Sequence, residues 1–403
     1  MGMRLRWRSV IVYTSIFLCI MIIFGWRQIL DENLVDLHTC PACYGQSHCS
    51  SMLEKETFNG NIRLTSYSQV KYMNYINIKN VYYAKFGEEH VVLKKLAHDS
   101  ELREIDEKFC KASKLPQNCN VSQAIKIIVT RAGNDIFQVI RHNKALFEES
   151  DAVKCTHDRN ILKLYEAFAR TDSGPYHVHH FLTMLAVNME PLLIMTHYQK
   201  WFPRIIGTCG RMIVEEYVGP TLTQLGATSW MKRADYARQL LEMAQELSEG
   251  EFHLYMTDVS LDNFAVDPSG KVKMIDAEDL IIVDSSINDL DASEHINDGF
   301  GCRDCLSYSV EDLCSHKHSD HNYFAVCKGM LSSSSFSEDI PDGLLHSPPD
   351  WVAAEYPSLL PLVEECASHP QDVHNYSKPR RKNSAIALHS LLSRILRTQE
   401  FSL

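Results

Sequence analysis

The stretch from Tyr255 to Asp279, YMTDVSLDNFAVDPSGKVKMIDAED, restricts the fold of this chain more than any other. It holds Asp258, then Asn263 five residues later, and Asp276 thirteen residues after that. Between Asn263 and Asp276, two short apolar segments flank the turn sequence Asp-Pro-Ser-Gly, which predicts a β-hairpin. Because a hairpin turns the chain back on itself, we expect the three polar side chains to converge.

This spacing is typical of protein kinases. There, an Asp accepts the proton of the substrate hydroxyl, an Asn five residues on binds Mg²⁺, and a second Asp after a hairpin binds metal. Carboxylate and amide oxygens suit Mg²⁺ or Mn²⁺. The pattern therefore predicts Asp258 as the catalytic base and Asn263 and Asp276 as metal ligands. Asp and Asn are also common in turns, so the prediction depends on the three matches together.

Upstream residues match other parts of a nucleotide site. The segment 72–96 is rich in β-branched and aromatic residues and predicts two strands joined at Phe-Gly-Glu-Glu. Its Val-Val-Leu-Lys sequence predicts that Lys94 contacts the α- and β-phosphates of ATP, with Lys95 as the rival. Glu190 is the candidate ion-pair partner of this lysine. A proline follows Glu190 and places it before a helix rather than inside one, so Glu101 remains the alternative.

A downstream segment, DHNYFAVCKGML at 320–331, resembles the kinase helix whose Asp clamps the catalytic loop. The resemblance gives that structural role to Asp320, and the alternative for this residue is a helix N-cap.

The order of predicted elements is a β-rich segment, helices, two more strands, a long helix over 230–249 and the acidic hairpin. This order predicts an α+β, protein-kinase-like, two-lobe fold with an N-terminal hydrophobic helix. The predicted parts are a signal anchor or signal peptide (1–27), a Cys-containing segment (28–71), an N-lobe (72–218) with a helical insertion (97–187), and a C-lobe (219–403).

The N-terminus resembles a targeting segment. Three arginines precede the uncharged apolar run 9–26, whose 18 residues are close to the minimum for a membrane-spanning helix. Basic residues on the N-terminal side keep that end cytosolic and direct the body across the membrane. Both an uncleaved anchor and a cleaved signal peptide fit, with the anchor slightly favoured because no clear cleavage site follows.

Cysteine usage agrees with an oxidising compartment. Of the 13 cysteines, Cys19 lies in the apolar run and twelve remain, which predicts a body stabilised by disulfides. The Cys40-Pro-Ala-Cys43 motif could also bind zinc or exchange thiols. The segment 302–321 has a zinc-like composition, but its spacing again favours disulfides. Sequons at Asn120 and Asn375 fit a lumenal glycoprotein.

The charge excludes one class of partner. Without the four arginines of residues 1–27, 36 basic residues face 51 acidic ones, a net charge of about −15. Because nucleic-acid binding needs a positive surface, we expect no nucleic-acid partner.

The motifs CPACYG, NVYYAKFG, VVLKKL, GRMIVEEYVG, DVSLDNFAV, IDAED, DHNYFAVC and GLLHSPPD together resemble the divergent protein kinase domain 2 family, also called deleted-in-autism proteins. The likeness covers nearly the whole chain beyond the apolar run. It implies a kinase-like protein of the Golgi or endoplasmic-reticulum lumen, either a type II membrane protein or secreted.

Several positions depart from the pattern of active kinases. The segment 73–80 that should cover the phosphates has no glycine, and Met256-Thr257 replaces the His-Arg pair before the catalytic Asp. Ala277 stands where the Phe of Asp-Phe-Gly is expected. Two functions therefore remain open.

The first is an ATP- and Mg²⁺- or Mn²⁺-dependent kinase acting on a protein or glycan hydroxyl. The second is a weak or inactive pseudokinase that serves as a secreted ligand, for example of a cell-surface receptor, or as a scaffold. In either case the N-terminal segment would supply the membrane contact.

Overall fold

The computed structural model describes the following residues, together with Thr14, Cys155 and Ser335 as isolated positions: 30–53, 62–69, 80–147, 158–172, 174–196, 199–250, 252–286, 290–297, 306–333, 342–368 and 380–400. The apolar run 9–26 lies outside this set except for Thr14, so its membrane helix stays a prediction. Within the described residues, no helix combines the length and hydropathy needed to cross a bilayer.

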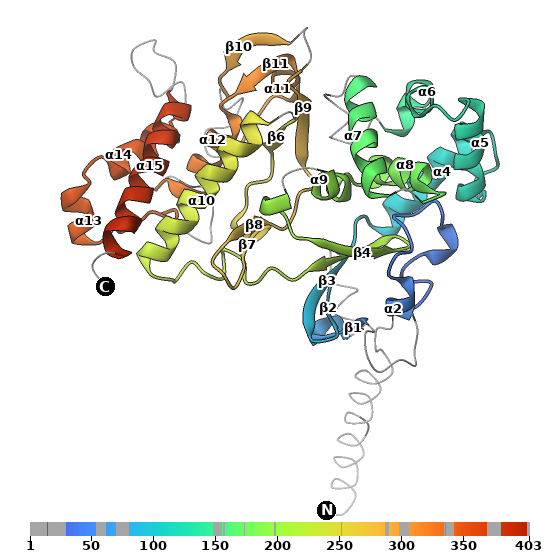
Figure 1. Cartoon of the computed structure of the whole chain (residues 1–403), viewed down its shortest axis with the longest axis horizontal. Coiled ribbons are helices and arrows are strands. Elements are labelled where there is room, and N and C mark those ends of the chain that lie inside the picture. The colour runs from blue at the N-terminus through green and yellow to red at the C-terminus, as the bar shows by residue number, and fades with distance from the viewer. Residues whose placement is uncertain are drawn as a thin grey trace, which may run out of the picture. The chain divides into compact units, whose positions relative to one another are not determined.

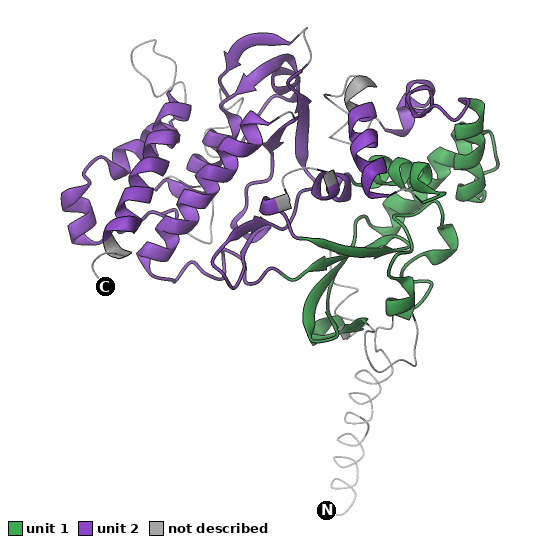
Figure 2. Cartoon of the chain, viewed as in Figure 1, with its two compact units in different colours: residues 1–131, 174–188, 204–217 green, residues 132–173, 189–203, 218–403 purple. Residues whose placement is uncertain are grey.

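The chain forms two compact units with mixed α and β content (Figure 2). Three separate stretches of sequence build each unit. Unit 1 contains residues 1–131, 174–188 and 204–217, and unit 2 contains residues 132–173, 189–203 and 218–403.

Unit 1 is organised around one antiparallel sheet with the strand order β1-β2-β3-β5-β4 (Figure 1). Its strands are β1 (Ile62–Leu64), β2 (Val81–Phe86), β3 (Glu89–Lys95), β4 (Ile205–Cys209) and β5 (Met212–Glu216). The predicted hairpin of β2 and β3 is confirmed, and Gly87 adopts a positive φ of 61° in its turn. The predicted pair of strands around Gly210 is confirmed as β4 and β5.

Helices and a short N-terminal segment complete the described part of unit 1. The helices are α2 (Cys49–Leu53), α4 (Asp99–Ser113), α5 (Val121–Arg131) and α8 (His177–Val187). Val35 and Met52 of the N-terminal segment join Leu64, Leu93 and Val214 of the sheet in one buried apolar cluster. The Cys-containing segment is therefore part of the unit's core.

Unit 2 is mainly helical. Its helices are α6 (Ile136–His142), α7 (Asp158–Thr171), α9 (Glu190–Thr196), α10 (Trp230–Glu249), α11 (Val310–Ser315), α12 (His321–Val326), α13 (Asp350–Glu355), α14 (Leu359–Cys366) and α15 (Arg381–Glu400). The long helix predicted over 230–249 is confirmed, and Gly250 follows its last residue. Apolar residues on α10, including Ala237, Leu240 and Leu247, are fully buried, as a helical spacing predicts.

The described residues of unit 2 also include three small strand pairs. β6 (Phe252–Met256) pairs with β9 (Leu280–Asp284), and β7 (Phe264–Val266) pairs with β8 (Val272–Met274), both antiparallel. β10 (Asp291–His295) pairs in parallel with β11 (His316–Ser319). The predicted acidic hairpin is thus confirmed as β7 and β8, with Gly270 at a φ of 87° in its turn.

Disulfides stabilise both units, as the cysteine count predicts. The pairs are Cys40–Cys43, Cys49–Cys209 and Cys110–Cys119 in unit 1, and Cys155–Cys314 and Cys327–Cys366 in unit 2. The zinc alternative for Cys40 and Cys43 is wrong, because the two sulfurs are bonded to each other. Cys302 and Cys305 lie outside the described residues.

Candidate active site

Asp258 and Asn263 are joined directly. The Nδ2 of Asn263 donates hydrogen bonds to the Oδ2 of Asp258 at 2.9 Å and to its backbone carbonyl at 3.4 Å. Asp258 follows strand β6 and is exposed, whereas Asn263 is only 2% exposed. The amide therefore orients a carboxylate that an incoming substrate can still reach.

The β7–β8 hairpin brings Asp276 back to Asn263. Phe264 of β7 pairs with Met274 of β8 at the end of the hairpin. Directly beyond this pair, the amide of Ile275 donates a hydrogen bond to the carbonyl of Asn263 at 2.8 Å. Asp276 is the residue after Ile275. Because strand pairing extends as far as Asn263 and Ile275, Asn263 and Asp276 lie close together in space although they are thirteen residues apart in sequence.

One small cavity of unit 2 is lined by the predicted base and both predicted metal ligands. Asp258, Asn263 and Asp276 line it together with Thr257 and Asp279, and its volume is about 10 Å³. That is room for a single water or ion centre. The oxygens of Asn263 and Asp276 are the hard ligands that Mg²⁺ or Mn²⁺ prefers, so these residues fit such an ion. Among the described residues, no cluster of three or more His, Cys, Asp or Glu forms a complete protein-only site. Mg²⁺ commonly completes its shell with water and phosphate oxygens instead.

Two buried residues of α12 hold the strand that leads to Asp258. The Oδ1 of Asn322 accepts the Met256 amide at 2.9 Å, and its Nδ2 donates to the Leu254 carbonyl at 2.8 Å. The Nε2 of His321 donates to the Met256 carbonyl at 2.7 Å. The sequence did not indicate a role for either residue, although both directly follow Asp320 in the segment that resembles a kinase helix.

Asp320 itself has a different set of partners from the one expected. The sequence suggested that its carboxylate clamps the catalytic loop. Instead it accepts the Asn297 amide at 2.8 Å and the Arg381 guanidinium at 3.0 Å. Burial raises the pKa of Asp320, and the charge of Arg381 opposes that rise. The Asn297 side chain then donates to the Nδ1 of His321 at 2.7 Å, so Asp320 acts on the strand through Asn297 and His321.

Thr257 connects the loop that carries Asp258 to the loop that carries Asp276. Its hydroxyl donates to the carbonyl of Asp279. Thr257 stands where kinases have the Arg of His-Arg-Asp, so the position has a local structural bond in this chain. Next to Asp276, the side chain of Ala277 is 2% exposed. The phenylalanine of active kinases is therefore replaced by a small buried residue.

Lys94 is paired within unit 1. Its Nζ lies 3.3 Å from the Oε2 of Glu215, and the two side chains are 12% and 2% exposed. Sequence reasoning did not identify Glu215. The rival, Lys95, forms ion pairs with Asp36 at 3.0 Å and Asp99 at 2.6 Å, which is a structural role.

The two glutamates predicted as lysine partners occupy different places. Glu101 lies in the first turn of α4, where its carboxylate accepts the His98 amide at 2.7 Å and closes a capping box. Glu190 is the first residue of α9 in unit 2 and is 2% exposed, so the expectation that it lies before the helix is wrong: a proline at the second helical position lacks only an N–H that the first turn leaves unpaired. The pairing of Glu190 with Lys94 stays a prediction.

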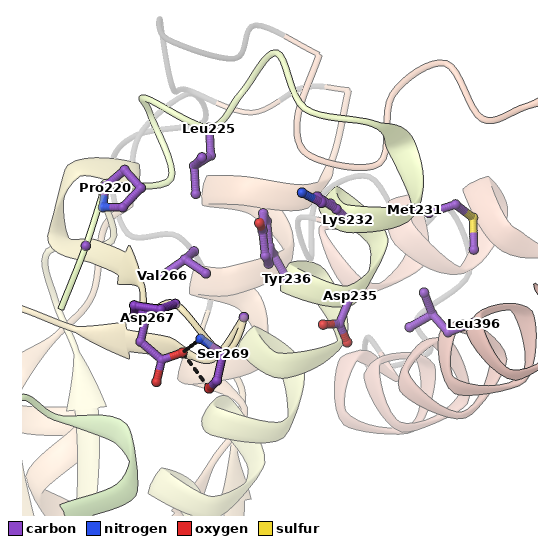
Figure 3. Close-up of a pocket in the computed structure, with 13 residues that line it drawn as sticks. Pro220, Leu225, Met231, Lys232, Asp235, Tyr236, Val266, Asp267, Ser269 and Leu396 are labelled. Atoms are coloured by element: carbon purple, nitrogen blue, oxygen red, sulfur yellow. Dashed lines mark hydrogen bonds between the residues drawn. The ribbon is translucent and has the colours of Figure 1, made fainter. Parts of the chain in front are cut away.

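A larger hollow in unit 2, about 780 Å³, contains none of the predicted site residues (Figure 3). Leu225, Tyr236 and Leu396 supply part of its apolar lining. The carboxylate of Asp267 is engaged by the amide and hydroxyl of Ser269 at 2.8 and 2.6 Å. These hydrogen bonds shape the β7–β8 turn, so the Asp267 carboxylate has a structural role. The cavity lined by Asp258, Asn263 and Asp276 is therefore the better candidate for the active site.

The comparisons with known proteins agree with this geometry. A family profile described as the protein-kinase domain of FAM69 matches residues 181–369, which include Asp258, Asn263 and Asp276. The chain therefore contains a domain of the protein-kinase class.

Curated relatives extend the likeness beyond this domain. Divergent protein kinase domain 2A of Homo sapiens is 34% identical over 375 residues, which is 85% of each chain. The Xenopus tropicalis and Mus musculus proteins of that name are each 33% identical, over 86% and 85% of this chain and 85% of their own length. The chain belongs to the divergent protein kinase domain 2 family.

Proposed function

We propose that the chain transfers the γ-phosphate of ATP to a hydroxyl group of a protein or glycan. The observation that carries this proposal is the 2.9 Å hydrogen bond between Asn263 and Asp258 in a cavity that Asp276 also lines. Phosphoryl transfer depends on positioning and charge stabilisation, which these residue types supply.

Each residue has a role in the proposed reaction. Asp258, exposed and oriented by Asn263, accepts the proton of the acceptor hydroxyl. Asn263 and Asp276 hold Mg²⁺ or Mn²⁺, which neutralises charge on the phosphates. Lys94 contacts the α- and β-phosphates, with Glu190 as its predicted carboxylate partner.

We place this activity in the Golgi or endoplasmic-reticulum lumen, with the protein anchored by its N-terminal segment or secreted. The five disulfides among the described residues support that location, since disulfides persist in oxidising compartments. The exposed Asn120 at the start of α5 supports glycosylation. Its Oδ1 accepts the Gln123 amide, and its Nδ2 has no hydrogen bond among the described residues.

The second candidate is a pseudokinase that acts as a secreted ligand or scaffold. The specific observation in its favour is the segment 73–80, MNYINIKN, which lacks the glycines that let a backbone approach phosphates. The buried Ala277 in place of phenylalanine points the same way.

Nucleotide binding by the purified full chain separates the two candidates. We expect millimolar Mg²⁺- or Mn²⁺-ATP to raise the melting temperature by several degrees, because a ligand of the folded state stabilises it by mass action. Asp276→Asn should abolish the shift. The matched control is Asp262→Asn, which removes one negative charge from an exposed residue of the same loop.

Transfer is then measured with γ-labelled ATP on secreted proteins and glycans as acceptors. Asp258→Asn should keep the thermal shift and lose transfer. A wild-type chain that shows neither shift nor transfer would support the ligand or scaffold function and contradict ours.

A further inference from the structure

The disulfide between Cys40 and Cys43 contributes little to holding unit 1 together. The two residues are three apart in sequence, with their Cα atoms 4.9 Å apart. A disulfide stabilises a fold mainly by constraining the unfolded chain, and the effect grows with loop length. The neighbouring Cys49–Cys209 bond spans 160 residues. The Cys40–Cys43 bond can therefore open at small cost to the fold.

The two cysteines of this bond differ in burial. Cys43 is fully buried, while Cys40 is partly exposed. An attacking thiolate must approach a sulfur directly, so the partly exposed residue Cys40 is the one at which we place the attack. Attack at Cys40 makes Cys43 the leaving group.

The backbone of Gly45 lies against the sulfur of Cys43. The amide of Gly45 donates to the Sγ of Cys43 at 3.4 Å, and the carbonyl oxygen of Gly45 lies 3.6 Å from the same sulfur. Gly45 has a φ of 134°, and a Cβ there would lie 2.5 Å from the hydroxyl of Thr208. Only glycine fits this position, so the backbone turn that directs the amide at the sulfur depends on it.

A buried cation lies beside the same segment. Arg211 is 2% exposed, and its Nε donates to the Thr39 hydroxyl at 3.4 Å, next to Cys40 in sequence. Its Nη2 is paired with Asp106 at 2.7 Å, whereas its Nη1 has no hydrogen bond within the described structure. Positive charge near a cysteine favours the thiolate form.

We propose that Cys40 and Cys43 form a thiol–disulfide exchange site whose substrates are protein dithiols. The substrate thiolate attacks the Sγ of Cys40, the Cys40–Cys43 bond breaks, and Cys43 leaves as a thiolate that accepts the Gly45 amide. The second substrate thiol loses its proton and attacks the substrate sulfur in the mixed disulfide, which releases Cys40 as a thiolate. The substrate dithiol is oxidised to a disulfide, Cys40 and Cys43 are reduced, and two electrons pass between them.

The other four described disulfides lack this combination. Cys327 and Cys366 are both fully buried. In Cys49–Cys209, Cys110–Cys119 and Cys155–Cys314 one sulfur is partly exposed, but no backbone amide is recorded on the buried partner. These bonds are therefore internal controls. The inference is independent of phosphoryl transfer, because it uses no residue of the kinase-like site.

The first experiment uses the oxidised wild-type chain and needs no variant. The protein is equilibrated with graded dithiothreitol, alkylated, and mapped by peptide mass spectrometry. We expect Cys40–Cys43 to open at a reductant concentration at least tenfold below that needed for Cys49–Cys209 or Cys327–Cys366. If it opens with them or after them, the inference is wrong.

The second experiment separates the two sulfurs. In Cys43→Ser, the thiol of Cys40 should react with oxidised glutathione to a mixed disulfide at least tenfold faster than the thiol of Cys43 does in Cys40→Ser. Equal rates, or a faster Cys43, would show a structural disulfide without exchange function.

The third experiment tests substrate class. A synthetic peptide with two cysteines should be oxidised by one equivalent of wild-type chain, with one Cys40–Cys43 bond consumed per peptide disulfide formed. Peptide oxidation without that loss would assign the reaction elsewhere and overturn the proposal.

Discussion

The Nζ of Lys94 on β3 lies 3.3 Å from the Oε2 of Glu215 on β5, and both side chains are largely removed from solvent. In the ladder Lys94 faces Ile213, so Glu215 is its diagonal neighbour on the same face of the sheet. The lysine proposed to contact phosphates is thus already held by a carboxylate of its own sheet.

We predict that Glu215→Gln destabilises unit 1 by about 3 kcal/mol, because it removes one charge of a buried ion pair. The double variant Lys94→Met/Glu215→Leu should recover most of this loss, since apolar residues of similar size replace the pair. Thermal melting and chemical denaturation measure both effects.

The control for the Lys94–Glu215 ion pair is the more exposed ion pair of Arg204 and Glu216, in which the Nε of Arg204 lies 3.9 Å from the Oε2 of Glu216. Glu216→Gln should cost less than about 1 kcal/mol. A Glu215→Gln variant as stable as Glu216→Gln would mean that the Lys94–Glu215 pair contributes nothing to the fold.

His321 should make stability depend on pH. Burial lowers its pKa from 6.5 to about 4, so the ring is neutral in the folded chain. The unfolded chain takes up a proton near pH 6.5. Stability from this group is therefore complete above pH 6.5 and decreases as the pH falls toward 4, by about 2 kcal/mol between pH 7.5 and pH 5.

His321→Gln keeps a donor for the Met256 carbonyl and removes the titration. Between pH 7.5 and pH 5, the variant should lose about 2 kcal/mol less stability than the wild type loses. His142→Gln, at an exposed position of α6, should leave the slope unchanged. Parallel pH profiles for wild type and His321→Gln would show that another group governs the acid response.

Replacement of the buried Asn322 side chain should destabilise unit 2 strongly. Asn322→Ala removes bonds to the Met256 amide, the Leu254 carbonyl and the Ser248 hydroxyl, and leaves buried backbone groups unsatisfied. We expect a loss of about 3 kcal/mol. Gln245→Ala, on α10, loses one exposed hydrogen bond to Glu249 and should change stability by less than about 0.5 kcal/mol. Similar melting temperatures for the two variants would refute the role given to Asn322.

The Cys49–Cys209 disulfide should stabilise unit 1 most. Replacement of both cysteines by serine removes a loop closure of 160 residues, for which chain entropy gives a loss of about 4–5 kcal/mol. The same change at Cys110 and Cys119, nine residues apart, should cost less. The reverse order in melting experiments would mean that native packing, not loop closure, decides the ranking.

Local signals predicted the elements correctly where they were strong. The apolar pairs around Asp-Pro-Ser-Gly and Phe-Gly-Glu-Glu specify hairpins, and the apolar spacing of 230–249 specifies a helix, because both depend on near neighbours in sequence. The approach of Asn263 to Asp276 follows from the hairpin alone. Glu101 belongs to a capping box whose N-cap is His98, and the sequence did not reveal it because the usual signature has Ser or Thr at that position.

Contacts between residues far apart in sequence could not be predicted from local sequence patterns. Glu215 meets Lys94 because β5 pairs with β3 in one register, and a shift by one residue would turn Glu215 to the opposite face. His321 and Asn322 reach Met256 across more than sixty residues of chain. The sequence by itself determined the hairpins, the long helix and the spacing of Asp258, Asn263 and Asp276. Only the tertiary structure decided which buried partners hold Lys94 and the strand before Asp258, since burial and register are properties of the packed chain.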